Sequence, residues 1–229
     1  MRAAARDGNA HYLYETTVCA ALPVISTLRD LLDTGDRVRT ISGIFSGTLA
    51  YLFNVYDGST AFSEIVRVAK ESGFTEPDPR DDLSGMDVAR KLTILARELG
   101  QPLEIGAFPV ENLIPEDLRS LSVDDFLAEL HRYDDLIDAR FREAEAENKV
   151  LRYVGTLSED GTAAVGLQKV DRGDALANIN LTDNIVRFVT DRYADNPLVV
   201  QGPGAGPGVT AGGVFSDLLR LAAYLKGAD

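Results

Sequence analysis

The order in which helix-like and strand-like segments follow one another is the feature that most constrains the fold. Pro23 is expected to begin a helix that ends at Gly35, because residues 24–32 place apolar side chains at helical spacing. Residues 37–44 alternate between polar and apolar in the manner of a strand. Helices are expected next at 47–56, 62–72 and 84–99, followed by a hairpin of 149–157 and 162–170 and by strands at 185–190 and 198–201. Strands and helices therefore do not alternate one by one. This order favours an α+β fold with a mixed β-sheet and helices on one face over a doubly wound sheet.

The remaining segments carry weaker signals. The first ten residues are typical of the end of a helix that stops at Gly8, and residues 12–18 are rich in the residue types that strands prefer. Residues 74–83 hold two prolines and four carboxylates, and we expect irregular structure there. Ser122, with Asp125 three residues later, predicts the start of a helix that runs to residue 147, and a last helix is expected from 209 to 226.

Charge and residue counts exclude several classes of protein. The 229 residues carry a net charge of −13, which opposes binding to nucleic acid or to an anionic membrane surface. One cysteine and two histidines provide neither an internal disulfide nor a zinc cage of thiolates and imidazoles. No apolar run approaches the roughly 18 residues of a membrane span, and no signal-peptide pattern follows Met1. We therefore expect a soluble cytoplasmic protein.

The densest chemistry lies between Glu76 and Lys91, where five carboxylates and three cations occur within sixteen residues. Asp87 and Lys91 are four residues apart on an expected helix, so both lie on the same face. Such a lysine can exchange a proton with an alcohol, and the nearby carboxylates suit an ammonium group. The alternative is an exposed ion pair beside a solvated loop, which spacing alone favours. The two prolines of the loop, which reduce its flexibility, argue against that alternative.

Two glycine-containing segments are candidates for ligand binding. Residues 42–48 (SGIFSGT) join a strand to a helix whose first N–H groups can hold an anion, although the pattern alone favours an ordinary capped helix. Residues 201–208 (QGPGAGPG) do not form a dinucleotide fingerprint, because proline or valine falls where its last glycine is required. Close contact between this backbone and a flat ligand remains open.

Nucleophilic catalysis is not favoured by the pattern of residues. His11 and His131 are expected to be structural or surface groups, and Cys19 stands in an apolar run that suits a small buried residue. A serine triad is therefore not expected.

The segment EPDPRDDLSGMDVARK at 76–91 resembles the signature of homoserine dehydrogenase. The segments YETTVCAALPVI, SGIFSGTLAYLF, KVLRYVG and GPGAGPGVTAGGVFSDLL are similar to other parts of that family in the same order. The second half is most similar to the version fused to aspartokinase. The resemblance implies an oxidoreductase that interconverts L-homoserine and L-aspartate 4-semialdehyde with NAD or NADP, in the synthesis of threonine, methionine and isoleucine. It also implies a fold like the C-terminal domain of glyceraldehyde-3-phosphate dehydrogenase.

Residue roles follow from the same resemblance. It implies that Lys91 and Asp87 are catalytic, and that the substrate is bound by Gly47, Thr48, Glu76, Asp82 and Asp87. It further implies nicotinamide contacts at Gly204, Ala205 and Thr210, and a site for a monovalent cation such as Na⁺ or K⁺ formed by Glu15 with the backbone carbonyls of Val18, Ala20 and Leu22. Phe74 stands where relatives often have tyrosine, and Cys19 and Ala21 replace glycines of the cation loop.

The resemblance also divides the chain. Residues 1–11 match the end of the connection from a nucleotide-binding half that precedes Tyr12 in the family and carries the main cofactor site and a second active-site lysine. Residues 12–201 are expected to bind the substrate and to form a homodimer. Residues 202–229 would pack on the nucleotide-binding half, and without it the final helix would expose Val214, Leu218 and Leu221. The chain alone is therefore expected to be inactive.

Two other functions remain as alternatives. The chain can be a non-catalytic remnant that binds homoserine or only dimerises. A dehydrogenase of another hydroxy acid is the weaker alternative, because the segment at 76–91 matches the homoserine dehydrogenase signature throughout.

Overall fold

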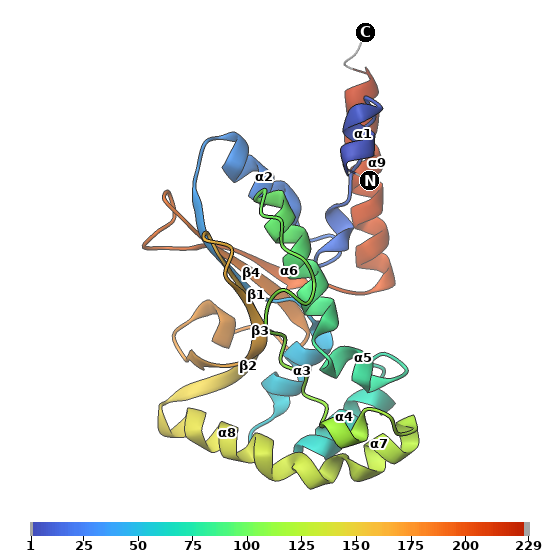
Figure 1. Cartoon of the computed structure of the whole chain (residues 1–229), viewed down its shortest axis with the longest axis vertical. Coiled ribbons are helices and arrows are strands. Elements are labelled where there is room, and N and C mark those ends of the chain that lie inside the picture. Colours follow the sequence, from blue (N-terminus) through green and yellow to red (C-terminus); the bar gives the residue numbers. More distant parts are fainter. Residues whose placement is uncertain (1, 227–229) are drawn as a thin grey trace.

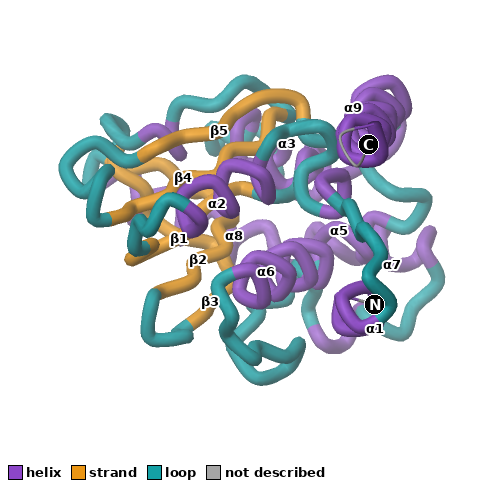
Figure 2. The backbone as a smooth tube through the Cα atoms, turned by 90° about the horizontal axis from the view of Figure 1, so that it is seen from above, coloured by secondary structure: helices purple, strands orange, loops and turns teal. Residues whose placement is uncertain are grey.

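A single five-stranded sheet forms the centre of the computed structural model, which describes residues 2–226 (Figures 1 and 2). Its strand order is β3-β2-β1-β4-β5, with β1 Val38–Ile44, β2 Lys149–Ser158, β3 Ala163–Asp171, β4 Asp183–Thr190 and β5 Leu198–Pro203. All four pairs of neighbouring strands are antiparallel. Within residues 2–226, parallel pairing is limited to an isolated bridge between Val110 and Val165. The α+β class is confirmed, and the expected mixture of parallel and antiparallel pairing is reduced to that bridge.

Nine α-helices accompany the sheet in the described residues. They are α1 Arg2–Asp7, α2 Val24–Asp33, α3 Gly47–Val55, α4 Phe62–Glu71, α5 Pro79–Leu83, α6 Met86–Glu98, α7 Val123–Glu129, α8 Asp134–Ala146 and α9 Pro207–Lys226. Four 3₁₀ turns join them: η1 Glu15–Thr17, η2 Glu116–Leu118, η3 Leu130–Tyr133 and η4 Ala175–Ala177. The helices expected at 23–35, 47–56, 62–72, 84–99 and 209–226 are confirmed within two residues at each end.

The two faces of the sheet are covered differently. Val186 and Phe188 belong to the large core that the α-helices form with the sheet, whereas Ile185 belongs to a small cluster around Leu176 and Ile179. Because adjacent strand residues point to opposite faces, the α-helices pack mainly on one face, and η4 with its flanking loop covers part of the other. The expectation of helices on one face therefore holds for the α-helices (Figure 2).

Helix α9 projects from the rest of the molecule (Figure 1). The rings of His11 and Tyr224 stack there with their centroids 4.9 Å apart. Gly213 brings α9 close to η1, because a Cβ at this position would lie 2.5 Å from Cγ2 of Thr16. Residues 227–229 of the expected C-terminal segment lie outside the described part of the chain, as does Met1 of the expected N-terminal one.

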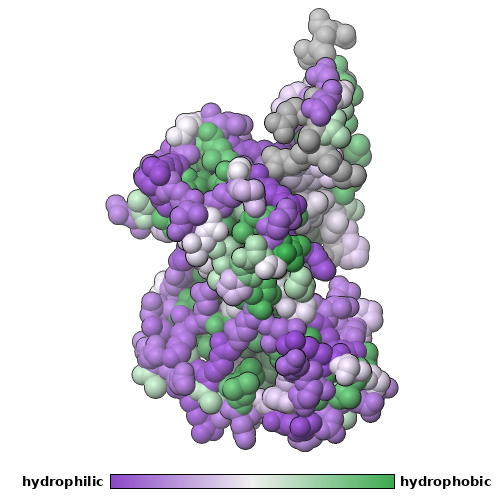
Figure 3. Space-filling model, in the orientation of Figure 1, coloured by the Kyte–Doolittle hydropathy of each residue, from purple (hydrophilic) through white to green (hydrophobic). Residues whose placement is uncertain are grey.

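Apolar side chains line the outer edge of α9 (Figure 3). Val214, Phe215, Leu218, Leu219, Tyr224 and Leu225 are exposed, whereas Leu221 is half-buried. The expected exposure is therefore confirmed at two of the three positions and wrong at Leu221. No helix in residues 2–226 combines the length and apolarity required to cross a bilayer.

The strand expected at 12–18 is absent, and this segment contains η1, which is followed by a turn at residues 18–21. The Glu15 side chain accepts hydrogen bonds from Ile25 N at 2.7 Å and Ser26 N at 2.9 Å. It thereby caps α2, whose own N-cap residue, Pro23, provides no side-chain acceptor. This role holds the segment against a helix end and away from the sheet, so its β-propensity is overridden.

Two further expectations are wrong for local reasons. Residues 79–83 of the stretch expected to be irregular form α5, because Pro79 occupies the first turn and Asp78 accepts a hydrogen bond from Arg80 N. The helix expected from 122 to 147 is interrupted by η3. Its second part begins at Asp134, whose carboxylate accepts hydrogen bonds from the N–H and the hydroxyl of Ser63, both at 2.7 Å, at the start of α4.

Candidate active site

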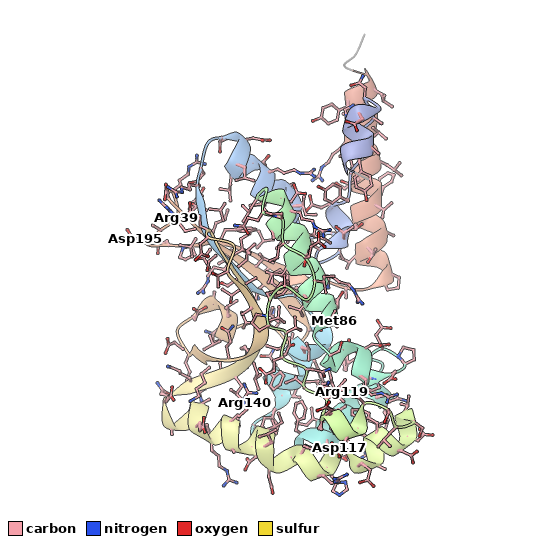
Figure 4. All side chains as sticks on the ribbon, in the orientation of Figure 1. Arg39, Met86, Asp117, Arg119, Arg140 and Asp195 are labelled. Atoms are coloured by element: carbon pink, nitrogen blue, oxygen red, sulfur yellow. The ribbon has the colours of Figure 1, made fainter. Side chains whose placement is uncertain are left out.

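A pocket of about 950 Å³ lies among the start of α3, the loop before α5, the first turns of α6 and the β5–α9 loop. Figure 4 labels Met86 at the end of α6 that faces this region. The pocket is lined by Ser46, Gly47, Thr48, Gly73, Phe74, Thr75, Glu76, Asp81, Asp82, Ser84, Met86, Asp87, Arg90, Lys91, Thr182, Pro203, Gly204, Ala205 and Gly206. Every residue expected to bind the substrate or to be catalytic is therefore part of one pocket.

The acidic loop that leads to α5 is held in place at its centre. The Arg80 guanidinium pairs with the Asp78 carboxylate at 2.7 Å and donates to the carbonyl of Leu121 at 2.6 Å. The hydrogen bond from Arg80 lowers the pKa of Asp78 below its ordinary value, and this effect exceeds the opposite effect of burial. With Pro79 buried, the loop is anchored to the body of the molecule. It is therefore not a freely solvated acidic loop.

Asp82 links the acidic loop to α3. The Thr48 hydroxyl lies 2.8 Å from Oδ1 of Asp82 and 2.7 Å from the carbonyl of Phe74, and it can donate to one of them at a time. The backbone N–H of Glu76 donates to Oδ2 of Asp82 at 2.8 Å. Burial raises the pKa of Asp82 above its ordinary value, and the charges of Glu76 and Asp87 raise it further. The pocket thus holds several carboxylates close enough to influence one another.

Lys91 lies at the base of the same pocket. Its Nζ is 2.7 Å from Oδ2 of Asp87 and donates to the carbonyl of Phe45 at 2.7 Å. The Lys91 side chain is 17% exposed and that of Asp87 is 52% exposed. The alternative of an exposed surface ion pair is therefore wrong for the lysine, which is held between two oxygens at a defined position.

The turn between α5 and α6 requires glycine. Gly85 has a φ of +71°, and a Cβ there would lie 1.9 Å from the hydroxyl oxygen of Tyr153. This close approach fixes the start of α6, and with it Asp87 and Lys91, relative to the sheet.

The start of α3 is both an ordinary capped helix and a part of the pocket, so both alternatives for residues 42–48 apply. Ser46 is the N-cap and accepts a hydrogen bond from Leu49 N at 3.2 Å, as in an ordinary capped helix. Gly47 and Thr48 nevertheless line the pocket, so the positive end of this helix adjoins it. The arrangement suits an anionic group such as a carboxylate.

The β5–α9 loop closes one side of the pocket through Gly204 and Ala205. A Cβ at Gly204 would lie 2.3 Å from Cγ of Asn184, so the buried amide of Asn184 and the loop backbone are in close contact. Thr210 is not part of the lining. It is exposed in the first turn of α9, where its N–H donates to the carbonyl of Gly206 at 2.9 Å.

Sequence reasoning missed Arg90 and Thr182 as pocket residues. Arg90 lines the pocket beside Lys91 and forms no ion pair with any residue between 2 and 226. The position of Arg90 in the charged segment at 76–91 could have indicated that it belongs to the site. Thr182 carries no such signal, because only folding brings the loop before β4 next to Gly47.

The residues expected to bind a monovalent cation have competing contacts. Besides Ile25 and Ser26, Glu15 meets Nη1 of Arg220 at 3.4 Å, so N–H donors already contact both carboxylate oxygens. Val18 and Ala20 are buried and Leu22 is half-buried. The positive φ angles of Cys19 and Ala20, +60° and +51°, give this loop an uncommon backbone path. Carbonyl oxygens suit such an ion, whereas the carboxylate of Glu15 serves first as a helix cap.

Cys19 is a buried structural residue. Burial raises the pKa of its thiol to about 11, and the side-chain amide of Asn184 contacts its sulfur at 3.3 Å. A thiol in this environment is a weak nucleophile, as expected from the sequence.

An α+β domain whose pocket combines a fixed lysine with several carboxylates and a helix N-terminus is suited to a small zwitterion that carries a hydroxyl or carbonyl group. The family model described as homoserine dehydrogenase matches residues 23–219. The chain belongs to the homoserine dehydrogenase family.

Curated relatives agree with this assignment. A bifunctional chloroplastic aspartokinase/homoserine dehydrogenase of Arabidopsis thaliana is 53% identical over 222 residues, which cover 96% of this chain and 24% of that protein. A homoserine dehydrogenase of Paracoccidioides brasiliensis is 51% identical over 91% of this chain and 59% of its own length. The chain thus spans about a quarter of the bifunctional relatives and about three fifths of the monofunctional one.

Solved structures share the fold. A Candida auris protein described as of unknown function aligns with a TM-score of 0.87 and 46% identity, over 92% of this chain and 60% of that one. A homoserine dehydrogenase of Thiobacillus denitrificans aligns with a TM-score of 0.78 and 27% identity, over 100% of this chain and 48% of that one. A hyperthermophilic archaeal homoserine dehydrogenase in complex with NADPH has a TM-score of 0.73 at 24% identity, covering 97% and 59% of the two chains.

Proposed function

We propose that this chain forms the part of a homoserine dehydrogenase that binds L-homoserine and L-aspartate 4-semialdehyde. The observation that carries the proposal is the arrangement of Lys91 with Asp87 on α6, facing the same pocket as Asp82 and Thr48. Threonine, methionine and isoleucine synthesis is the setting that this reaction implies.

Each end of the substrate has a matching set of groups. The carboxylates of Glu76 and Asp82 suit the ammonium group. Arg90 and the N-terminus of α3 suit the carboxylate. Lys91 then meets the hydroxyl at C4. In the reducing direction its N–H donates a proton to the aldehyde oxygen, and in the oxidising direction the lysine accepts the hydroxyl proton.

The cofactor in this proposal is NAD or NADP, which supplies or accepts the hydride. The proposal assigns only the nicotinamide end to this chain, beside Gly204 and Ala205, which line the pocket. The rest of the cofactor is assigned to the nucleotide-binding half of the intact enzyme. NADPH in the archaeal neighbour supports this choice of cofactor.

The exposed apolar side chains of α9 support the proposal that residues 202–229 pack on that nucleotide-binding half. Residues 1–11 would form the connection to it, and residues 12–201 the substrate-binding and dimerisation domain. We propose that residues 1–229 alone do not oxidise NADPH in the presence of aspartate semialdehyde, whereas an enzyme that also contains the nucleotide-binding half does. Turnover by the chain alone would contradict this division.

Four finer points belong to the same proposal. The chain forms a homodimer through its sheet, which sedimentation of the pure protein tests. The carbonyls of Val18, Ala20 and Leu22 hold Na⁺ or K⁺ beside Glu15. The fold is of the type seen in the C-terminal domain of glyceraldehyde-3-phosphate dehydrogenase. Its compartment is the cytoplasm, as one free cysteine favours, although a plant relative is named chloroplastic.

Substrate analogues test the central assignment. In the intact enzyme, we expect kcat/KM for L-homoserine to exceed that for 4-hydroxybutyrate, which lacks the ammonium group, by at least about 100-fold. Equal values for the two compounds would show that the carboxylates do not bind an ammonium group and would favour a dehydrogenase of another hydroxy acid.

A further inference from the structure

A second pocket, of about 330 Å³, lies at the opposite end of α3 from the candidate active site and shares no residue with it. It is formed by the end of α3, one face of α8, the start of β2 and the loop after β3. Its lining consists of Phe53, Asn54, Tyr56, Asp57, Phe141, Glu145, Val150, Leu151, Arg152, Arg172, Ala177 and Asn178.

Arg152 is the unusual member of this lining. It is 7% exposed, yet no carboxylate pairs with it in the described part of the chain. Its Nη1 donates to the carbonyls of Phe53 at 2.7 Å and Leu151 at 2.8 Å, and its Nη2 donates to that of Ala177 at 2.8 Å. A guanidinium has five N–H donors, so these bonds leave two unused. One of the two is Nε, which is buried and has no partner among residues 2–226.

A structural role explains only part of this arrangement. Two of the three carbonyl contacts, to Phe53 and Ala177, lie at the ends of α3 and η4, where a positive charge is favourable. They do not explain why a buried cation keeps an unpaired donor or why a second cation, Arg172, lines the same pocket. Burial, with a smaller contribution from the charge of Arg172, lowers the pKa of Arg152 to about 10, so the two guanidinium groups lie close enough to repel each other. An anion between the two guanidinium groups would relieve this repulsion.

The rest of the lining narrows the chemistry of that anion. Asp57 and Glu145 bring two negative charges, which disfavour a multiply charged anion such as phosphate. Hydrogen bonds from the hydroxyl and the N–H of Ser59 lower the pKa of Asp57, so its carboxylate is ionised at neutral pH. Phe53, Tyr56 and Phe141 add an apolar wall. Two cations, two carboxylates and an aromatic wall suit a zwitterion with an apolar side chain.

We propose that this second pocket binds a small apolar α-amino acid, whose carboxylate contacts Arg152 and Arg172 and whose ammonium group contacts Asp57 or Glu145. The site is separate from the candidate active site and does not depend on the function proposed for it. One end of α3 adjoins each pocket, so a ligand here contacts the same nine-residue helix that presents Gly47 and Thr48 to the first pocket.

Calorimetric titration of the full chain with L-valine tests the proposal. We expect one valine bound per chain, and at least tenfold weaker binding of 3-methylbutanoate, which lacks the ammonium group, and of 2-methylpropan-1-amine, which lacks the carboxylate. Tight binding of 3-methylbutanoate alone would overturn the zwitterion assignment, and absence of valine binding at millimolar concentration would overturn the site.

Variants locate the binding. Arg172 is exposed, so Arg172→Ala is expected to keep the fold and to weaken valine binding at least fivefold, whereas Arg67→Ala, which removes an exposed arginine of α4 outside the pocket, leaves it unchanged. Arg152→Lys, checked for folding by circular dichroism, should weaken valine binding still more. Glu76→Gln in the first pocket should have no effect on valine. Valine binding that responds to Glu76→Gln but not to Arg172→Ala would place it in the first pocket and overturn the proposal.

Discussion

Lys91 Nζ lies 2.7 Å from Oδ2 of Asp87, one turn away on α6, and it also donates to the backbone carbonyl of Phe45 in the connection between β1 and α3. The side chain thus has one position in the pocket instead of the many that a surface lysine samples. A proton donor that is held in this way meets the substrate hydroxyl in a defined geometry, which is what proton transfer requires.

Lys91→Met in the intact enzyme is expected to lower kcat by about 100-fold or more, because positioned acid–base groups contribute about 10²–10⁴ to rate. The KM for homoserine should change by less than about threefold, since substrate binding is proposed for the acids and Arg90. Steady-state kinetics measure both values, and Lys169→Ala, a lysine outside the pocket, is the control. Equal losses in kcat and in homoserine affinity would mean that Lys91 only positions the substrate.

Homoserine binding is expected to weaken in acid at a pH above the ordinary aspartate value of 3.8, because burial and neighbouring charges raise the pKa of Asp82. Glu76→Gln removes one like charge, so the midpoint of this weakening should move to lower pH. Folding has the opposite sign: the contribution of Asp82 to stability is fully present below its unfolded-state pKa and is lost as the pH rises through its raised folded-state pKa. Calorimetric titration at several pH values measures the midpoint, and an unchanged midpoint in Glu76→Gln would contradict the coupling.

Arg90→Gln is expected to raise the KM for homoserine about tenfold or more with a smaller change in kcat, because Arg90 has no ion pair in residues 2–226 and is available for a carboxylate. The inhibition constant of 3-aminopropan-1-ol, which lacks the carboxylate, should stay the same in this variant. If that compound weakens as much as homoserine does, Arg90 does not bind the carboxylate.

Gly85→Ala is expected to reduce the free energy of unfolding by about 3 kcal/mol or more, because it combines a positive φ with a clash against Tyr153. Gly100→Ala is the matched control. Gly100 has a φ of +77° with no atom within 4 Å of a Cβ, so the same change should cost only about 1 kcal/mol there. Urea denaturation measures both, and equal losses would show that the Tyr153 contact does not hold the start of α6.

Much of the fold could be predicted from local patterns, and the errors share a physical cause. The helical spacing at 24–32 and the Asp160-Gly161 hairpin are local signals, and both elements are present. The strand expected at 12–18 fails because Glu15 caps a helix that follows it, and α8 begins anew at Asp134 because that carboxylate bonds to Ser63 on α4. These contacts join distant parts of the chain, so no local window of sequence contains them.

The site shows the same division. Asp87 and Lys91 lie one helical turn apart, and their spacing alone placed them on one face. The addition of Gly47, Thr48 and the 202–206 loop to the same pocket depended on a family resemblance, because sheet pairing and not sequence proximity brings them together. Neither helical spacing nor the family resemblance could predict the unpaired Nε of Arg152, because it is recognised only when the neighbours of Arg152 in the fold are known.

The most direct test of the account is the binding of L-homoserine to the pure chain, measured by calorimetry at pH 7. We predict one homoserine per chain in the first pocket, with binding weakened at least about tenfold in Asp82→Asn and unchanged in Arg172→Ala. Absence of homoserine binding by the folded chain, or binding that is unaffected by Asp82→Asn, would contradict the assignment of this pocket to the substrate.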